Sequence, residues 1–232
     1  AREPEIADLQ DFLQKLGADV HGAGTSTITV LGGGVRRGCV HRCIGDRIAA
    51  ATYLCAAAAA GGQVTLRGVD YRHLATVTTA LGQAGCRLQC TEDSITLESD
   101  SRLRAIPPVR TSPYPGFPTD AQAPLMAALL RSEGAVMFVE NMFDSRYRHV
   151  PELVRMGADI RLEGRVAVVY GTRELHGAAV RCTDLRGGAA LAIAALQTPD
   201  TTLIHDIYHI QRGYQDMAGD LRALGADAAV EV

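Results

Sequence analysis

Tryptophan is missing from this sequence of 232 residues, aromatic residues make up only 5% of it, and its formal net charge is only −3. With so few aromatic side chains, the chain is not expected to build aromatic cages for cations or stacking platforms for bases. Proteins that coat nucleic acids or membrane surfaces usually carry a clear basic excess, so neither partner is expected. The composition, 47% hydrophobic and 21% charged, is typical of a globular protein.

Long hydrophobic runs are missing too. The longest apolar stretch covers residues 49–60 and includes Thr52. A membrane-spanning helix needs roughly 20 apolar residues, so this shorter stretch is predicted to be a buried helix. The first four residues, Ala-Arg-Glu-Pro, do not show the basic-then-apolar pattern of a secretory signal. We therefore expect a soluble, cytoplasmic protein with no membrane partner.

The spacing of the cysteines gives little support for a metal site. The six cysteines include no Cys-x-x-Cys pair. Cys39, His41 and Cys43 lie close together, but a site there would need further ligands from elsewhere in the chain. Reduced structural thiols are the better interpretation. The cysteine spacing therefore predicts no metal site.

Glycines that end predicted helices recur along the chain. Gly17, Gly85, Gly157 and Gly225 each close a run in which apolar residues fall at helical spacing, and they follow one another at intervals of roughly 70 residues. Glycine adopts the left-handed conformation at a helix end at little cost. One such turn would be commonplace, but four at nearly equal intervals indicate a duplicated architecture.

A second helix can be placed in each repeat, and a loop with an arginine follows it. The helix begins near an aspartate suited to cap it, and a strand then leads to the loop. The aspartates are Asp46, Asp120 and Asp184, and the arginines are Arg72, Arg146 and Arg212. The unit is therefore helix, strand, helix and hairpin, present nearly three times, with a partial copy of only a helix and a hairpin at the front. This order predicts an α/β fold.

The same repetition indicates where chemistry could take place. Helix N-termini favour anions through their free N–H groups and the helix dipole. Equivalent helix starts and loops would gather at one end and bring together Asp120, Arg146, Asp184, Arg186 and Arg212. That group suits a phosphorylated or carboxylated ligand, with arginines for the anion and a carboxylate for proton transfer. The alternative is that the aspartates only cap helices and pair with the arginines on the surface.

Three segments resemble elements of a known family. Residues 117–123 read FPTDAQA, residues 182–187 read CTDLRG, and residues 208–214 read YHIQRGY. They are similar to the FPTDxQA, ATDLRA and YHIxRGY elements of UDP-N-acetylglucosamine enolpyruvyl transferases, and the resemblance continues in order over the whole chain. It implies repeated βαβαββ units that form an inverted, inside-out α/β barrel domain.

The resemblance also implies a domain organisation. Members of the family have two such domains, which close over the substrates like a clamp. Residues 1–44 would finish the first domain and supply the linker, and residues 45–232 would form most of the second. The missing upstream half would provide a lysine–asparagine pair and a mobile loop with the catalytic cysteine. None of the six cysteines matches that loop position, so this chain alone is expected to be inactive.

The reaction implied by the resemblance uses two small-molecule substrates and no metal or organic cofactor. The enolpyruvyl group of phosphoenolpyruvate is transferred to the 3'-hydroxyl of UDP-N-acetylglucosamine, the first committed step of peptidoglycan synthesis. Asp120 matches the carboxylate that takes the proton of this hydroxyl, and Arg212 matches the arginine that grips phosphoenolpyruvate. The other matching substrate-binding residues are Met142, Phe143, Arg146, Asp184 and Arg186. An aspartate of ordinary pKa is a weak base, so its role needs alignment, or burial that raises its basicity.

Two segments depart from the family pattern. Residues 49–51 are alanines where the family usually has Glu-Thr/Ala-Gly, and residues 32–43 differ from the usual loop. Neither change touches Asp120 or Arg212. Two alternatives stay open: a shikimate-phosphate enolpyruvyl transferase, against which the FPTD and YHIxRGY contexts argue, and a non-catalytic relative that binds a sugar nucleotide.

Overall fold

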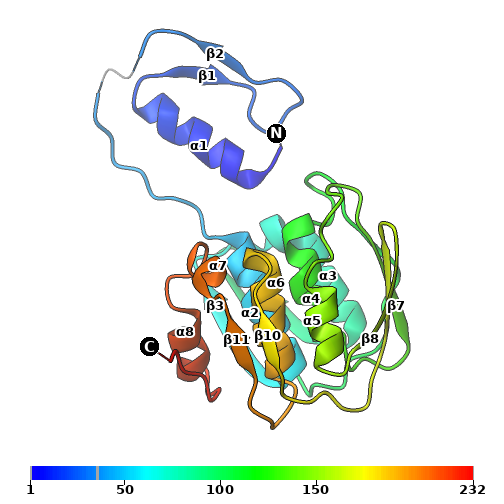
Figure 1. Cartoon of the computed structure of the whole chain (residues 1–232). Helices are drawn as coiled ribbons and strands as arrows, with labels where there is room; N and C mark the ends of the chain where they lie inside the picture. Colours follow the sequence, from blue (N-terminus) through cyan, green and yellow to red (C-terminus); the bar gives the residue numbers. More distant parts are fainter. Residues whose placement is uncertain (1, 35–36, 232) are drawn as a thin grey trace.

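The front of the chain forms a small unit. The computed structural model describes residues 2–34 and 37–231. Helix α1 (Pro4–Lys15) is followed by an antiparallel hairpin of β1 (Asp19–His21) and β2 (Thr29–Leu31). An extended segment, residues 38–45, connects this unit to the rest of the molecule (Figure 1). The helix and the hairpin expected from the partial front copy are therefore both present.

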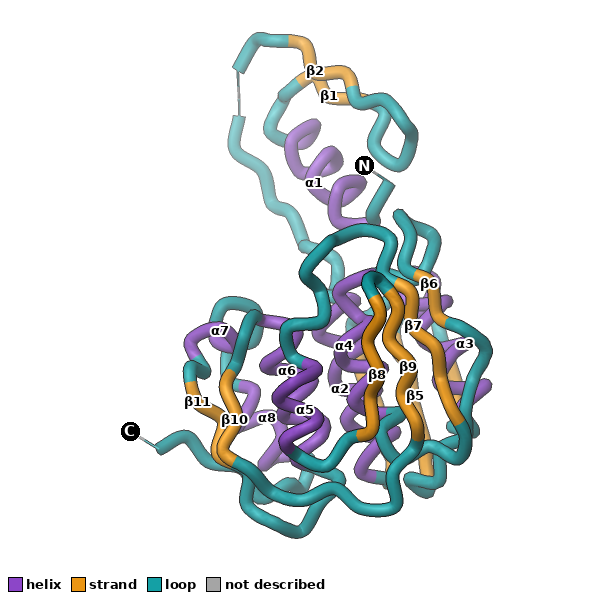
Figure 2. The backbone as a smooth tube through the Cα atoms, turned by 45° about the vertical axis from the view of Figure 1, so that its right-hand side comes forward, coloured by secondary structure: helices purple, strands orange, loops and turns teal. Residues whose placement is uncertain are grey.

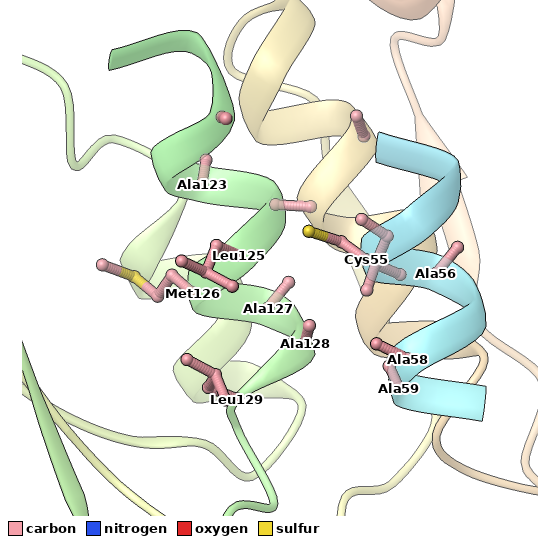
Figure 3. Close-up of a cluster of buried hydrophobic side chains, with 14 of the residues drawn as sticks. Cys55, Ala56, Ala58, Ala59, Ala123, Leu125, Met126, Ala127, Ala128 and Leu129 are labelled. Carbon is pink, nitrogen blue, oxygen red and sulfur yellow. The ribbon is translucent and has the colours of Figure 1, made fainter. Parts of the chain in front are cut away.

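Three alanine-rich helices form the centre of the larger part. They are α2 (Arg47–Ala60), α4 (Thr119–Ala128) and α6 (Leu185–Ala195). Most of their side chains are buried, and Figure 3 shows those of α2 and α4 at their shared interface, with Cys55 directed at α4. Small alanine side chains let helix backbones approach one another closely. The prediction of a buried helix at residues 49–60 is confirmed.

Strands surround these helices on the outside (Figure 2). Within residues 37–231 they form an antiparallel sheet of order β3-β5-β4, a mixed sheet of order β6-β7-β9-β8, and a parallel pair of β10 and β11. The strands are β3 (Gly62–Arg67), β4 (Arg87–Cys90), β5 (Ser94–Ser99), β6 (Val109–Arg110), β7 (Ala135–Val139), β8 (Asp159–Glu163), β9 (Val166–Tyr170), β10 (Ala179–Arg181) and β11 (Leu203–His205).

The remaining helices complete the repeats. They are the 3-10 helix η1 (Tyr71–Leu74) and the α-helices α3 (Ala75–Ala84), α5 (Val150–Arg155), α7 (Tyr208–Gln211) and α8 (Met217–Ala223). The second repeat, β6-α4-β7-α5-β8-β9, has the full βαβαββ order, and the third ends with α8, after which residues 224–231 form no strand. With helices inside and sheets outside, the predicted inside-out α/β fold is confirmed. No helix in the described ranges has both the length and the apolar character needed to cross a membrane.

The four predicted helix-ending glycines all adopt the left-handed conformation. Their φ angles are 90° at Gly17, 115° at Gly85, 95° at Gly157 and 102° at Gly225. A side chain with a Cβ is strained in this region, so glycine is the residue that lets each helix turn back into its hairpin. The repeat seen in the sequence is thus a repeat of backbone geometry.

The capping aspartates follow the prediction at two of three helix starts. Asp46 caps α2 and Asp184 caps α6, each accepting hydrogen bonds from two backbone N–H groups of the first turn. At α4 the prediction is wrong, because the N-cap is Pro118 and Asp120 lies inside the first turn. The Asp120 carboxylate binds arginine side chains instead of its own helix end.

Gly82 and Gly85, inside and at the end of α3, test whether the left-handed conformation at the helix end requires glycine. Replacing Gly85 with alanine should lower the free energy of unfolding by about 1–2 kcal/mol, because an L-residue is strained at this left-handed position. Gly82 lies inside α3, where an added Cβ would be 3.6 Å from Leu88 Cδ1, an ordinary contact. Gly82→Ala should therefore raise stability, by about 0.5–1 kcal/mol. Urea unfolding followed by circular dichroism measures both, and equal effects would contradict the expectation.

Candidate active site at the ends of the core helices

Asp120 lies between two arginine side chains. Arg146, from the loop after β7, forms an ion pair with Oδ1 of Asp120. Arg186, from the first turn of α6, places Nη2 3.3 Å from Oδ2 of the same carboxylate. The side chain of Asp120 is 39% exposed and those of the arginines are 17% exposed, so the carboxylate can be reached from solvent. Three residues far apart in sequence thus meet at the N-terminal ends of α4 and α6.

The pKa of Asp120 reflects two opposing influences. Burial alone raises the pKa of this carboxyl group, but the charges of Arg186 and Arg146 lower it by more, so it lies below the ordinary 3.8. The group is therefore ionised at neutral pH. Burial therefore acts on Asp120 in the expected direction, but the neighbouring cations outweigh it and leave the carboxylate less basic than an ordinary aspartate.

Asp184 fixes the position from which Arg186 reaches Asp120. Its Oδ1 accepts hydrogen bonds from the backbone N–H groups of Arg186 and Gly187, each at 2.9 Å. A Cβ at Gly187 would lie 2.9 Å from Cβ of His149, so this turn packs tightly against the buried histidine. Burial lowers the pKa of His149 to about 4, and the ring is neutral at pH 7. In this structure Asp184 is therefore a helix cap that positions an arginine.

Arg212 lies at the same end of α6. It follows α7, and a Cβ on the next residue, Gly213, would be 2.8 Å from Cδ2 of Leu185. Tyr214 anchors the loop on the other side, with its hydroxyl 2.7 Å from Oγ1 of Thr52 in α2. The Arg212 side chain is exposed and forms no ion pair with an acidic group in the described part of the chain. Its position is thus set by its neighbours, and its charge stays available to an anion.

A buried glutamate organises the strand end that carries Met142 and Phe143. Glu140 is only 1% exposed, and its Oε1 accepts hydrogen bonds from the backbone N–H groups of Met142 at 2.6 Å and Phe143 at 3.0 Å. Thr111 donates to the same oxygen at 3.0 Å, and Thr119 donates to Oε2 at 2.8 Å. Because its N–H is already used, Met142 can meet a ligand only through its carbonyl oxygen or its side chain.

A cleft of about 380 Å³ opens beside these groups. Its lining residues are Phe143, Asp144, Ser145, Arg146, Arg148 and Asp184. The guanidinium of Arg146 lies 5.5 Å above the ring of Phe143. Three of the predicted site residues line the cleft, three form the Asp120 cluster, and Arg146 belongs to both. Arginine side chains beside an ionised carboxylate can hold an anionic ligand, and the carboxylate can accept a proton from it.

Comparison with known protein families shows to which family the chain belongs. The family described as EPSP synthase (3-phosphoshikimate 1-carboxyvinyltransferase) matches residues 1–221. The chain belongs to this enolpyruvyl transferase family. It is 45% identical over 227 residues to the UDP-N-acetylglucosamine 1-carboxyvinyltransferase of Zymomonas mobilis subsp. mobilis, covering 98% of this chain and 53% of that protein. The protein of the same name from Trichlorobacter lovleyi is 44% identical, with coverages of 98% and 54%.

Solved structures of enolpyruvyl transferases have the same fold. The enolpyruvyl transferase NikO from Streptomyces tendae superposes with a TM-score of 0.82 at 30% identity, over 98% of this chain and 54% of that one. The EPSP synthase from Acinetobacter baumannii reaches a TM-score of 0.71 at 20% identity over 95% of this chain, which shows a shared fold alone. The chain spans about half the length of the relatives it matches.

Sequence reasoning missed one residue that organises this candidate site. Glu140 directly follows the apolar strand β7, where an acidic side chain must either be solvated or find several donors. The place of Glu140 directly after an apolar strand could have identified it in the sequence as a buried, hydrogen-bonded residue. Its four hydrogen bonds join the segments that carry Met142, Phe143 and, through Thr119, the start of α4.

Glu140 can be tested by two substitutions. Glu140→Ala leaves buried donors without an acceptor and should lower the free energy of unfolding by about 1–3 kcal/mol. Glu140→Gln keeps one oxygen for the Met142 and Phe143 N–H groups and should cost clearly less. Urea unfolding gives the stabilities, and amide hydrogen exchange at Met142 and Phe143 reports the local anchoring. Equal protection of these amides in Glu140→Ala and the unsubstituted protein would contradict the assignment.

Proposed function

We propose that this chain is the C-terminal half of an enzyme that transfers the enolpyruvyl group of phosphoenolpyruvate to the 3'-hydroxyl of UDP-N-acetylglucosamine, with release of phosphate. The observation that carries the proposal is the Asp120 carboxylate held between Arg146 and Arg186 beside an open cleft. Relatives at 44–45% identity with the name UDP-N-acetylglucosamine 1-carboxyvinyltransferase support it. The reaction would belong to peptidoglycan synthesis in the cytoplasm.

Asp120 is the proposed base for the acceptor hydroxyl. Its depressed pKa keeps it ionised, so it can accept a proton, but the same arginines make it a weak base. Anionic substrates change this balance, because a phosphate or carboxylate beside Arg146 and Arg186 offsets their positive charge and thereby raises the pKa of Asp120. Basicity would then appear when both substrates are bound.

The other site residues are proposed to position the substrates. Arg212, exposed and without an acidic partner in the described chain, would hold phosphoenolpyruvate by charge and hydrogen bonds. Met142 and Phe143 would form the wall against the sugar nucleotide, Met142 through its carbonyl oxygen because Glu140 takes its N–H. Arg146, Asp184 and Arg186 would complete the surface that faces the other half of the enzyme.

We also propose the domain division at residue 44. Residues 1–44 would complete a first domain whose upstream part supplies the lysine–asparagine pair and the cysteine loop, and residues 45–232 would form most of the second domain. The extended connection of residues 38–45 supports this division. So do the apolar side chains of β2, since Val30 is 66% and Leu31 is 58% exposed, surface that a complete domain would cover.

Two other functions can be distinguished by one experiment. Phosphate release is measured for the complete protein with phosphoenolpyruvate and either UDP-N-acetylglucosamine or shikimate 3-phosphate as the acceptor. Release only with the sugar nucleotide supports the proposal. Release with shikimate 3-phosphate supports the second transferase, and sugar-nucleotide binding without release supports a non-catalytic relative.

The role of Asp120 predicts a large loss of turnover. In the complete enzyme, Asp120→Ala should nearly abolish phosphate release, and Asp120→Asn should lower kcat by roughly 10²–10⁴-fold, the usual contribution of a positioned acid or base. The exposed Asp159 of β8 provides a control, and Asp159→Asn should leave the rate unchanged. Substantial activity in a folded Asp120→Ala protein would remove Asp120 from the mechanism.

The role of Arg212 predicts a substrate-specific defect. Arg212→Ala should lower kcat/KM for phosphoenolpyruvate at least about tenfold, the loss expected when a charged hydrogen bond to an anion is removed. The KM for UDP-N-acetylglucosamine should change little, and Arg212→Lys should retain part of the effect. Arg222→Ala in α8 is the control. An unchanged dependence on phosphoenolpyruvate in Arg212→Ala would contradict the proposed grip.

A further inference from the structure

His41 is held against helix α1 by two carboxylates. Its Nε2 lies 3.1 Å from Oδ1 of Asp8, and its Nδ1 lies 3.4 Å from Oδ2 of Asp11. The histidine side chain is only 5% exposed, and its ring packs beside that of Phe12 with centroids 5.3 Å apart. A histidine in the connecting segment is therefore fixed by residues of one helix.

Cys43 brings a third kind of ligand to the same place. The ligand atoms of Asp8, His41 and Cys43 all lie within 4.8 Å of one another. Tetrahedral zinc, with bonds of about 2.0–2.3 Å to N, O and S, requires its ligand atoms to be roughly 3.2–3.8 Å apart. The 3.1 Å between Asp8 Oδ1 and His41 Nε2 is just below the short end of this spacing. Sγ of the exposed Cys43 lies within 4.8 Å of both and would turn toward them when the ion binds. The third ligand beside His41 and Cys43 thus comes from α1, and Cys39 is not among the three.

We propose that Asp8, His41 and Cys43 form a Zn²⁺ site, with Oδ1, Nε2 and Sγ as protein ligands and water in the fourth position. Binding replaces the hydrogen bond between His41 and Asp8 and releases the thiol proton of Cys43. The aspartate and the thiolate balance the charge of the ion. The choice of zinc follows from the mixture of carboxylate, imidazole and thiolate ligands.

Asp11 and Lys15 lie at the Nδ1 edge of the His41 ring, opposite the proposed ion. With zinc on Nε2, the proton of His41 lies on Nδ1 and can be donated to Asp11, an arrangement that commonly orients zinc-binding histidines. Lys15 Nζ lies 3.3 Å from Nδ1 but forms its ion pair with Asp11 at 2.6 Å. The ammonium group is therefore next to the supporting carboxylate, on the ring edge away from the proposed ion.

The effect of the ion would be to fasten the connecting segment to α1. His41 and Cys43 belong to residues 38–45, and Asp8 belongs to the helix, so a bound ion links the two. An ion pair of 2.6 Å between Glu5 of α1 and Arg47 already joins α1 to α2, the helix that follows the connecting segment. The site would thus restrict the orientation of the front unit, whatever reaction the complete protein catalyses.

Metal titration of the intact, reduced protein tests the site without any substrate. Co²⁺ should bind with one-to-one stoichiometry and give a near-ultraviolet band from thiolate to cobalt, and Zn²⁺ should displace it. Cys43→Ser should remove the band, and Cys43→Ser, Asp8→Asn and His41→Ala should each weaken Zn²⁺ binding at least tenfold. Asp11→Asn should weaken it about tenfold, the usual effect of losing the partner of a metal-bound histidine.

The controls are other cysteines of the chain. Cys39 lies in the same segment but outside the proposed ligand set, and Cys90 is exposed on β4. Cys39→Ser and Cys90→Ser should keep the band and the affinity. The urea midpoint without metal should be equal in Cys43→Ser and the unsubstituted protein, and Zn²⁺ should raise only the latter. Failure of the unsubstituted protein to bind one equivalent, or loss of the band in Cys39→Ser but not in Cys43→Ser, would overturn the assignment.

Discussion

The close packing of α2, α4 and α6 is the constraint on which the rest of the structure depends. Their interfaces are built largely from alanine. On the side of α6 that faces α7, a Cβ at Gly188 would come within 2.7 Å of Cys182 Sγ and Ile210 Cγ1, so α6 is closely packed there too. Such packing leaves little freedom to slide or rotate one helix against another. The N-terminal ends of the three helices are therefore held together, and side chains from distant repeats meet there.

This arrangement gives the site its electrostatic character. A carboxylate in the first turn of one helix meets an arginine in the first turn of the next and an arginine from a neighbouring loop. The arginines that hold Asp120 also lower its pKa, so the carboxylate binds a proton less strongly than an ordinary aspartate would. The same cations are what an anionic substrate needs. Substrate binding and base activation would thus use one set of charges, and the site would become basic only when occupied.

The sequence could predict the parts of the fold that rest on local backbone chemistry. Gly17, Gly85, Gly157 and Gly225 are visible in the sequence because a left-handed turn favours glycine over other residues, and all four have that geometry. Asp46 and Asp184 were predictable as caps for the same kind of local reason. These features depend on a few neighbouring residues.

The repeats predicted that Asp120, Arg146 and Arg186 would come together, but other features that depend on tertiary contacts escaped prediction. Asp120 looks like a cap in sequence, but Arg146 and Arg186, brought from 26 and 66 positions away, compete for its carboxylate. Glu140 is an ordinary acidic residue until the fold supplies its four donors. Asp8 becomes a neighbour of His41 only because the connecting segment returns along α1, a distance of 33 positions in sequence.

Arg212 differs from the other two arginines in that its charge is not neutralised by an acidic group of the described residues. In contrast to Arg146 and Arg186, it forms no ion pair with the acidic groups of the described residues, although its loop is anchored by Leu185 and by the bond between Tyr214 and Thr52. Keeping a cation exposed on a fixed loop gains nothing for the stability of this half by itself. An unneutralised guanidinium on an anchored loop is useful when its counterion arrives from outside. This is the property that the proposed role of Arg212 requires: the loop is anchored before a ligand binds, and its charge would be satisfied only afterwards.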